Sequence, residues 1–216
     1  MRCDTRLVRA IILLAAAPAA FAQRWEFGGG AGFGFYTSRD VHGESGVASA
    51  RPGNGLSASA WLTNDTGRRL GGEIRYDYQR GDMRLSSGGT TAGFGGQSHA
   101  IHYDFQLHFA PKDARTRPFL AFGAGAKIYQ GTGTEVAYQP LNQIALLTKT
   151  TDTRPLASVG FGVKTRAGKR LGLRFEVHDF LTPFPDKVIA AAQNAKVGGW
   201  VQDFVATVGL SVLTAQ

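Results

Sequence analysis

Eight charged or titratable side chains recur two residues apart in three short stretches of the sequence. They are Glu73, Arg75 and Asp77, then His102 and Asp104, then Arg174, Glu176 and His178. Carboxylates beside imidazoles are the residue types of general acid–base catalysis. Carboxylates beside guanidiniums are also the residue types of a buried network in which each charge neutralises another. The two possibilities differ in where the chain places these side chains, which depends on the elements that carry them.

A spacing of two residues is the period of a β-strand, in which alternate side chains share a face. The same alternation occurs in eight stretches of the chain. These are residues 25–36, 55–63, 70–79, 97–109, 117–129, 154–165, 171–180 and 201–214. Strands of soluble sheets are usually about five or six residues long, whereas a tilted bilayer crossing needs about 9–11. The pattern therefore predicts eight membrane-crossing strands.

The two faces of each predicted strand differ in polarity. One face is apolar, and the other mixes charges with Gly, Ala and Ser. In FGGGAGFGFY (27–36), aromatic residues alternate with glycines, and no register fits the Gly-x-Gly-x-x-Gly pattern of a dinucleotide site. Small residues suit the interior of a narrow eight-stranded barrel. We therefore expect Phe122 and Val159 to face lipid, and Gly123 and Gly160 to face the lumen and leave room for longer side chains.

The connections between the predicted strands alternate in length. Short, turn-rich connections cover 64–69, 111–117 and 166–170, and long ones cover 38–54, 81–96, 131–152 and 181–199. Outer-membrane barrels combine short periplasmic turns with long extracellular loops, and both of their termini are periplasmic. The same arrangement is predicted here.

The long loops carry few local signals. The first two are rich in Gly and Ser, and we expect them to be mobile. The fourth contains PDKVIAAAQNAKVGG, which has the spacing of a short helix with Asp186 as its cap and Gly198 as its stop. Such a helix would pack on the barrel rim or offer an exposed contact to a partner.

The first 22 residues predict a secretory signal peptide. A basic head, an apolar run over 10–17 and Ala-Phe-Ala at 20–22 form its three parts. Its removal leaves 23–216 as a single outer-membrane β-barrel domain without cysteine, because Cys3 leaves with it. The net charge falls from +8 to +6, since the leader carries three Arg and one Asp. This mild excess is dispersed without a Lys/Arg run, so we expect it to face anionic lipid headgroups and not nucleic acid.

The chain resembles the small outer-membrane β-barrel superfamily, of the OmpA-type eight-stranded kind, over nearly all of 24–214. The resemblance rests on WEFGGGAGFGFY, RPFLAFGAGAKIY, LGLRFEVHDF and VATVGLSVL. It implies an all-β, antiparallel, up-and-down transmembrane barrel with a filled lumen. It also implies a monomer in the bacterial outer membrane, in contact with outer-membrane lipid and inserted by the outer-membrane assembly machinery. Such chains typically end in an aromatic residue that this machinery reads, whereas this one ends in Thr-Ala-Gln.

In such a barrel the eight charged or titratable residues share the middle depth of the lumen, counted from the short turns. The seventh strand lies opposite the third, so Arg174 and Glu176 are expected to reach Glu73 and Arg75 across the lumen. The favoured interpretation is a neutralising plug, because buried charges must be paired. The alternative is acid–base chemistry among the histidines and carboxylates.

The enzymatic comparison is the lipid A deacylase barrel family, in which a His and a Ser stand close together with an acidic partner. The matching stretch here is FEVHDFLT, which offers His178 but no Ser two residues later. A nucleophile beside its base is the minimum for that reaction. The five histidines also lack tight metal-ligand spacing, so no catalytic residue, metal or cofactor is predicted.

The expected function is a non-enzymatic structural or surface-interaction role, with a surface partner bound through the long extracellular loops. Two alternatives remain open. One is a lipid-modifying barrel enzyme, and the other is a narrow conduit or binder for a small solute or lipid.

Overall fold

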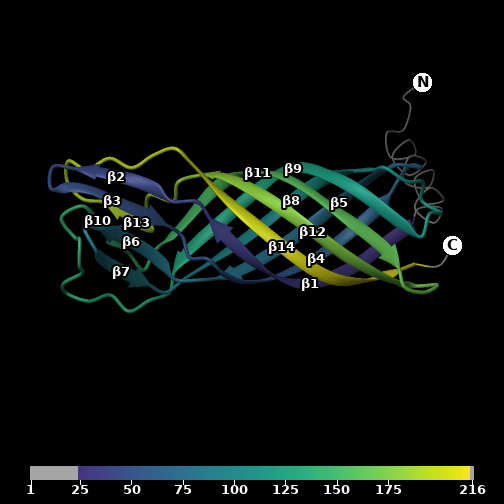
Figure 1. The fold of residues 1–216 in the computed structure, drawn as a ribbon, viewed down its shortest axis with the longest axis horizontal. Helices are drawn as coiled ribbons and strands as arrows, with labels where there is room; N and C mark the ends of the chain where they lie inside the picture. Colours follow the sequence, from purple (N-terminus) through teal and green to yellow (C-terminus); the bar gives the residue numbers. More distant parts are fainter. Residues whose placement is uncertain (1–23, 215–216) are drawn as a thin grey trace, which may run out of the picture.

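The computed structural model describes residues 24–214, and the predicted signal peptide lies outside them. Eight long strands form a closed antiparallel barrel (Figure 1). Barrel strands that follow one another in the chain pair with each other, and the first and last strands pair to close the barrel. They are β1 (Arg24–Tyr36), β4 (Gly55–Asp65), β5 (Leu70–Arg80), β8 (Gly96–His108), β9 (Thr116–Gly131), β11 (Thr151–Arg166), β12 (Leu171–Pro183) and β14 (Trp200–Leu213). The predicted up-and-down barrel is confirmed. No helix in this part of the chain is long and apolar enough to cross a membrane.

The apolar faces of the barrel strands point outward. Phe122 is 53% exposed and Val159 is 62% exposed, and they are neighbours across β9 and β11. The residues that follow them point inward: a Cβ on Gly123 would lie 2.3 Å from an oxygen of Asp104, and one on Gly160 would lie 2.7 Å from His178. The predicted outward direction of these two apolar side chains and the inward direction of the two glycines are confirmed.

The glycines of β1 make room for large side chains from neighbouring strands. A Cβ on Gly28 would lie 2.3 Å from the indole of Trp61, and one on Gly34 would lie 2.4 Å from the amide of Gln79. Both Trp61 and Gln79 are buried in the lumen. The cluster FGGGAGFGFY therefore serves packing inside the barrel.

The four long loops fold into a compact cap at one end of the barrel (Figure 1). One sheet of the cap contains β2 (Arg39–Gly43), β3 (Gly46–Arg51), β6 (Met83–Ser87) and β7 (Thr90–Phe94), and a second pairs β10 (Ala145–Leu147) with β13 (Ile189–Ala191). Their inner faces share one apolar core. Its most buried members are Val41, Ala48, Ala50, Leu85, Ala145, Leu147, Val188, Ile189 and Val201.

The prediction that the first two loops are mobile Gly/Ser segments is wrong. They form the four-stranded sheet of the cap, in which β3 pairs with β6 across the two loops. Gly88 and Gly89 have φ values of 54° and 83°, as the two central residues of a tight I′ hairpin turn require. These glycines specify a hairpin, because only a residue without a side chain adopts this conformation at little cost.

The predicted helix in the fourth loop is also absent. Asp186 pairs with Arg154, and a single turn at Pro185 leads directly into β13. Val188 and Ile189 are fully buried in the cap core. Pairing with β10 and burial of these two side chains therefore outweigh a local helix preference, which is weak over so few residues.

Val159 provides a test of the face assignment, because it lies near the middle of β11. Val159→Arg is expected to destabilise the barrel by about 2–4 kcal/mol, the cost of a cation at the lipid midplane. Urea unfolding in lipid vesicles measures this cost, and Val47→Arg on the exposed face of the cap is the matched control. A spin label at position 159 should be relaxed by oxygen dissolved in lipid. Ready access of a water-soluble quencher to that label would reverse the assignment of the faces.

Candidate functional site

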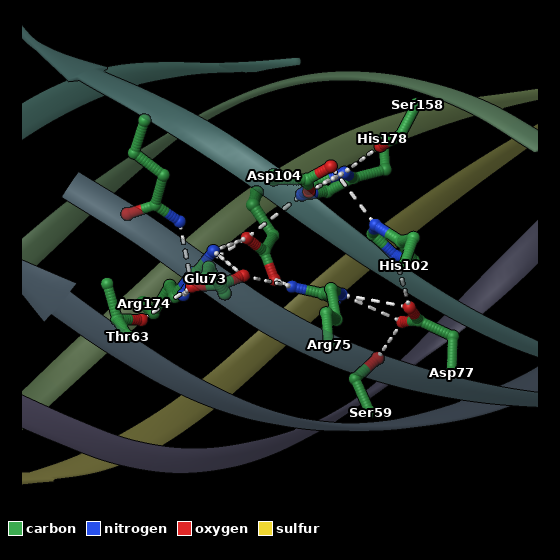
Figure 2. A network of polar contacts seen from close by, with 12 residues as sticks. Ser59, Thr63, Glu73, Arg75, Asp77, His102, Asp104, Ser158, Arg174 and His178 are labelled. Carbon is green, nitrogen blue, oxygen red and sulfur yellow. Dashed lines mark hydrogen bonds and ion pairs between the residues drawn. The ribbon is translucent and has the colours of Figure 1, made fainter. Parts of the chain in front are cut away.

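The structure brings all eight candidate residues together inside the barrel. Figure 2 shows seven of them with labels, all except Glu176. β5 supplies three of them, β8 supplies two and β12 supplies three, each at inward positions of its strand. All eight are buried, with at most 4% of each residue exposed. The period of two therefore aims every one of these side chains into the same buried interior.

Two arginines connect opposite walls of the barrel. Arg174 on β12 donates to both carboxylate oxygens of Glu73 on β5, at 2.5 and 2.9 Å. Arg75 on β5 pairs with Glu176 on β12 in the reverse direction. Charge-assisted pairs of this kind are the strongest hydrogen bonds in proteins. Together the two pairs tie strands that lie on opposite sides of the lumen.

Each arginine also pairs along its own strand. Arg75 Nε lies 3.0 Å from both oxygens of Asp77, and Arg174 Nε donates to Glu176 Oε2 at 2.7 Å. Neutral hydroxyl groups donate further hydrogen bonds to two of these carboxylates. Ser59 donates to Asp77 at 2.5 Å and Thr63 to Glu73 at 2.6 Å.

The histidines extend this network toward the cap. His102 places Nδ1 at 3.0 Å from Asp104 and Nε2 at 3.2 Å from Asp77, so it can donate at both nitrogens only as the imidazolium. His178 places Nε2 at 3.3 Å from Glu176 and Nδ1 at 3.7 Å from Asp104. The four carboxylates of the network thus face two guanidiniums and two imidazoles.

Sequence reasoning missed Trp61. Its buried indole lies beneath both arginines, 4.7 Å from the guanidinium carbon of Arg174 and 5.4 Å from that of Arg75, measured to the ring centroid. A cation over an aromatic face is attracted by the ring. The alternation in the sequence could have placed Trp61 in the lumen, because it lies on the same inward face of β4 as Ser59 and Thr63.

Further ion pairs fill the lumen above and below the network. Toward the cap, Lys127 pairs with Asp203. Toward the short turns, Lys164 pairs with Glu26 at 3.0 Å, and Arg117 pairs with Asp65 at 2.5 Å. The barrel interior is therefore occupied by paired charges along its length.

A hydroxyl does stand beside His178, although it does not follow it in the sequence. Ser158 on β11 places Oγ at 3.3 Å from His178 Nδ1, while Glu176 contacts the other ring nitrogen. This order resembles that of a nucleophile, a base and an orienting acid. Ser158 is 1% exposed and His178 is 0% exposed, so a lipid in the surrounding membrane does not reach them in this conformation. Within residues 24–214, no group of His, Cys, Asp and Glu side chains is arranged to hold a metal ion.

A closed eight-stranded barrel with an apolar outer surface and a filled polar lumen defines the class of small outer-membrane barrels. The chain matches the outer membrane protein beta-barrel domain over residues 7–211. It therefore belongs to that family, which confirms the resemblance drawn from its strand motifs.

Solved structures agree on the fold. OprG from Pseudomonas aeruginosa superposes with a TM-score of 0.59 at 10% identity, covering 90% of this chain and 96% of its own. Neisserial surface protein A has a TM-score of 0.54 at 11% identity, with 87% and 96% covered. Ail of Yersinia pestis, solved with the heparin analogue sucrose octasulfate, has a TM-score of 0.50 at 7% identity, with 89% and 99% covered. No curated protein matches the chain in sequence.

Proposed function

We propose that the chain is a non-enzymatic barrel of the bacterial outer membrane that presents its cap as a recognition surface. The folded cap is the observation that carries this proposal. Its two sheets share a core that fixes the loops, and a preordered surface binds with less loss of conformational entropy than a mobile one. Several large side chains of the cap do not pack in this core and remain exposed on its surface. Tyr138 is 71% exposed, and Val136 and Trp200 are also exposed.

The filled lumen argues against a conduit. The paired charges of Arg174 with Glu73 and of Arg75 with Glu176 cross the middle of the barrel. A solute would have to displace them and leave buried charges without partners, at a cost of about 3–5 kcal/mol for each pair broken. The same burial argues against catalysis by His178.

A gel and a conductance recording test the location and the sealed lumen. The mature chain is expected in the outer-membrane fraction, resistant to high-salt washing, with different mobilities for boiled and unboiled samples in SDS. Planar bilayers that contain the folded barrel should show no discrete conductance steps. A protein recovered only from the soluble periplasm, with a single mobility, would contradict the location. Regular conductance steps would favour the conduit.

Display on bacterial cells tests the recognition role. Cells that carry the protein are expected to bind immobilised glycans, matrix proteins or neighbouring cells more than cells without it. Val136→Ser with Tyr138→Ser should reduce that binding by about tenfold, since a few exposed aromatic anchors dominate most interfaces. Val47→Ser, at another exposed site on the cap, is the matched control. Equal binding by cells with and without the protein would contradict the proposal.

A further inference from the structure

The positive charge that is dispersed in the sequence gathers at one end of the fold. All three short turns opposite the cap are basic, and Asp113 is the acidic residue among them. Their cations are Arg68 and Arg69 between β4 and β5, Lys112 and Arg115 between β8 and β9, and Lys169 and Arg170 between β11 and β12, with Arg166 at the end of β11. Backbone hydrogen bonds from His108 to Arg69 and from Arg166 to Arg115 place these turns side by side. This end of the barrel is therefore a basic rim.

No carboxylate within residues 24–214 forms an ion pair with Arg68 or Arg69. Both residues are exposed. The nearby carboxylate of Asp65 is already paired with Arg117 and lies inside the barrel mouth. Two guanidiniums are thus presented outward at the edge of the lipid-facing surface.

An apolar groove begins directly beside these arginines. It has a volume of about 360 Å³ on the outer face of β5, β8 and β9, with Leu70, Tyr103, Leu107 and Phe122 among its lining residues. Leu70 also lines a second hollow of about 430 Å³, which contains Arg68 and Arg69. The two hollows therefore meet at Leu70, and one surface passes from apolar to basic.

Gly72 forms part of the floor of this groove. A Cβ at this position would lie 2.1 Å from the hydroxyl of Tyr103, which leans over the glycine. The ring of Tyr103 packs edge-on against Phe105 at 5.2 Å, and Phe105 stacks on Phe122 at 5.9 Å. The hydroxyl of Tyr103 donates no hydrogen bond to another residue of the described chain.

We propose that this surface is a binding site for an anionic phospholipid of the periplasmic leaflet. One acyl chain lies in the groove against Phe105 and Phe122, and the phosphate binds Arg68 and Arg69. The Tyr103 hydroxyl donates to an ester oxygen between them. Charge complementarity selects the ligand, since guanidiniums bind phosphate with two parallel hydrogen bonds. The site rests on the proposed location in the outer membrane.

Native mass spectrometry of the refolded barrel tests this site. The protein is released from detergent in the presence of equal amounts of phosphatidylglycerol and phosphatidylethanolamine with identical acyl chains. The wild type is expected to retain phosphatidylglycerol about tenfold more, because each basic residue at a membrane surface favours anionic lipid. Arg68→Gln with Arg69→Gln should bring the ratio of the two lipids close to one. Lys169→Gln with Arg170→Gln, which removes the same charge from another turn, should leave the preference unchanged.

A second variant tests the apolar half of the site. Gly72→Leu displaces the Tyr103 hydroxyl, which lies 2.1 Å from the position of the new Cβ, and fills the floor of the groove. Retention of both lipids should therefore fall while the unboiled gel mobility stays that of a folded barrel. The proposal would be overturned if Gly72→Leu retained both lipids as the wild type does and inorganic phosphate displaced the lipid fully. That result would show that the site binds phosphate alone. Equal loss of preference in the Lys169 and Arg170 control would also overturn it. A wild type that fails to insert into bilayers would instead contradict the proposed location.

Discussion

Arg174→Met and Glu73→Leu are each expected to destabilise the barrel by about 3–5 kcal/mol, because either change leaves its partner charged and buried. Both side chains are at most 1% exposed and share two hydrogen bonds. The double variant removes both charges together. It should therefore lose less stability than the sum of the two single changes, by an interaction term of about 0.5–3 kcal/mol.

Urea unfolding in lipid vesicles, for the parent, both single variants and the double variant, measures this coupling. Lys169→Met is the control, because Lys169 is exposed on a turn and its replacement should change stability by no more than about 0.5 kcal/mol. Strict additivity, with both single variants as stable as the parent, would refute the plug. It would indicate a lumen that is kept charged for function, since catalytic residues are often lost without loss of stability.

The barrel itself could be predicted from the sequence because its strands are long and two-sided. Over ten or more residues, the alternation in β5 and β12 fixes which side chains share a face. It also fixes their depth relative to the short turns, which places Arg174 level with Glu73. These two properties are sufficient to predict the contacts across the lumen without the register of the strands.

The cap and the hydroxyl beside His178 could not be predicted in this way. β10 and β13 are three residues each, too short for any period to be read, and they form because distant loops meet over one core. Ser158 reaches His178 because Gly160 is the residue paired with His178 across β11 and β12. That contact depends on interstrand register, which a single sequence specifies only through the completed barrel.

Trp61→Ala is expected to cost about 3–5 kcal/mol, the usual penalty for removing a large buried aromatic side chain. The indole fills the lumen between two glycines, since a Cβ on Gly28 or on Gly209 would lie 2.3 Å from it. It also supports the guanidinium of Arg174. Its loss therefore opens a cavity beside the ion pairs that hold opposite walls together.

The complementary substitution adds a side chain at Gly28, the glycine that faces the indole of Trp61, as Gly28→Val. In the parent it should cost about 1–3 kcal/mol, because the indole is held against β1 and β14 and cannot move away from the new methyl groups. In the Trp61→Ala background the same valine fills part of the cavity, so it should be neutral or stabilising. Gly168→Val is the control, because a Cβ there meets nothing within 4 Å. Unfolding can be followed by the fluorescence of Trp25 and Trp200, which remain in every variant.

The interaction between the Gly28→Val and Trp61→Ala changes distinguishes two reasons for the glycine. One is close packing against the indole, and the other is close approach of the neighbouring strand backbones. If Gly28 is required because β1 must approach its neighbours closely, valine will be equally costly whether or not the indole is present. If Gly28 is required because Trp61 occupies the space above it, the cost will disappear with the indole. The 2.3 Å approach to the indole favours the second outcome. Equal costs in the two backgrounds would show that the glycines of β1 serve strand pairing and not the filled lumen.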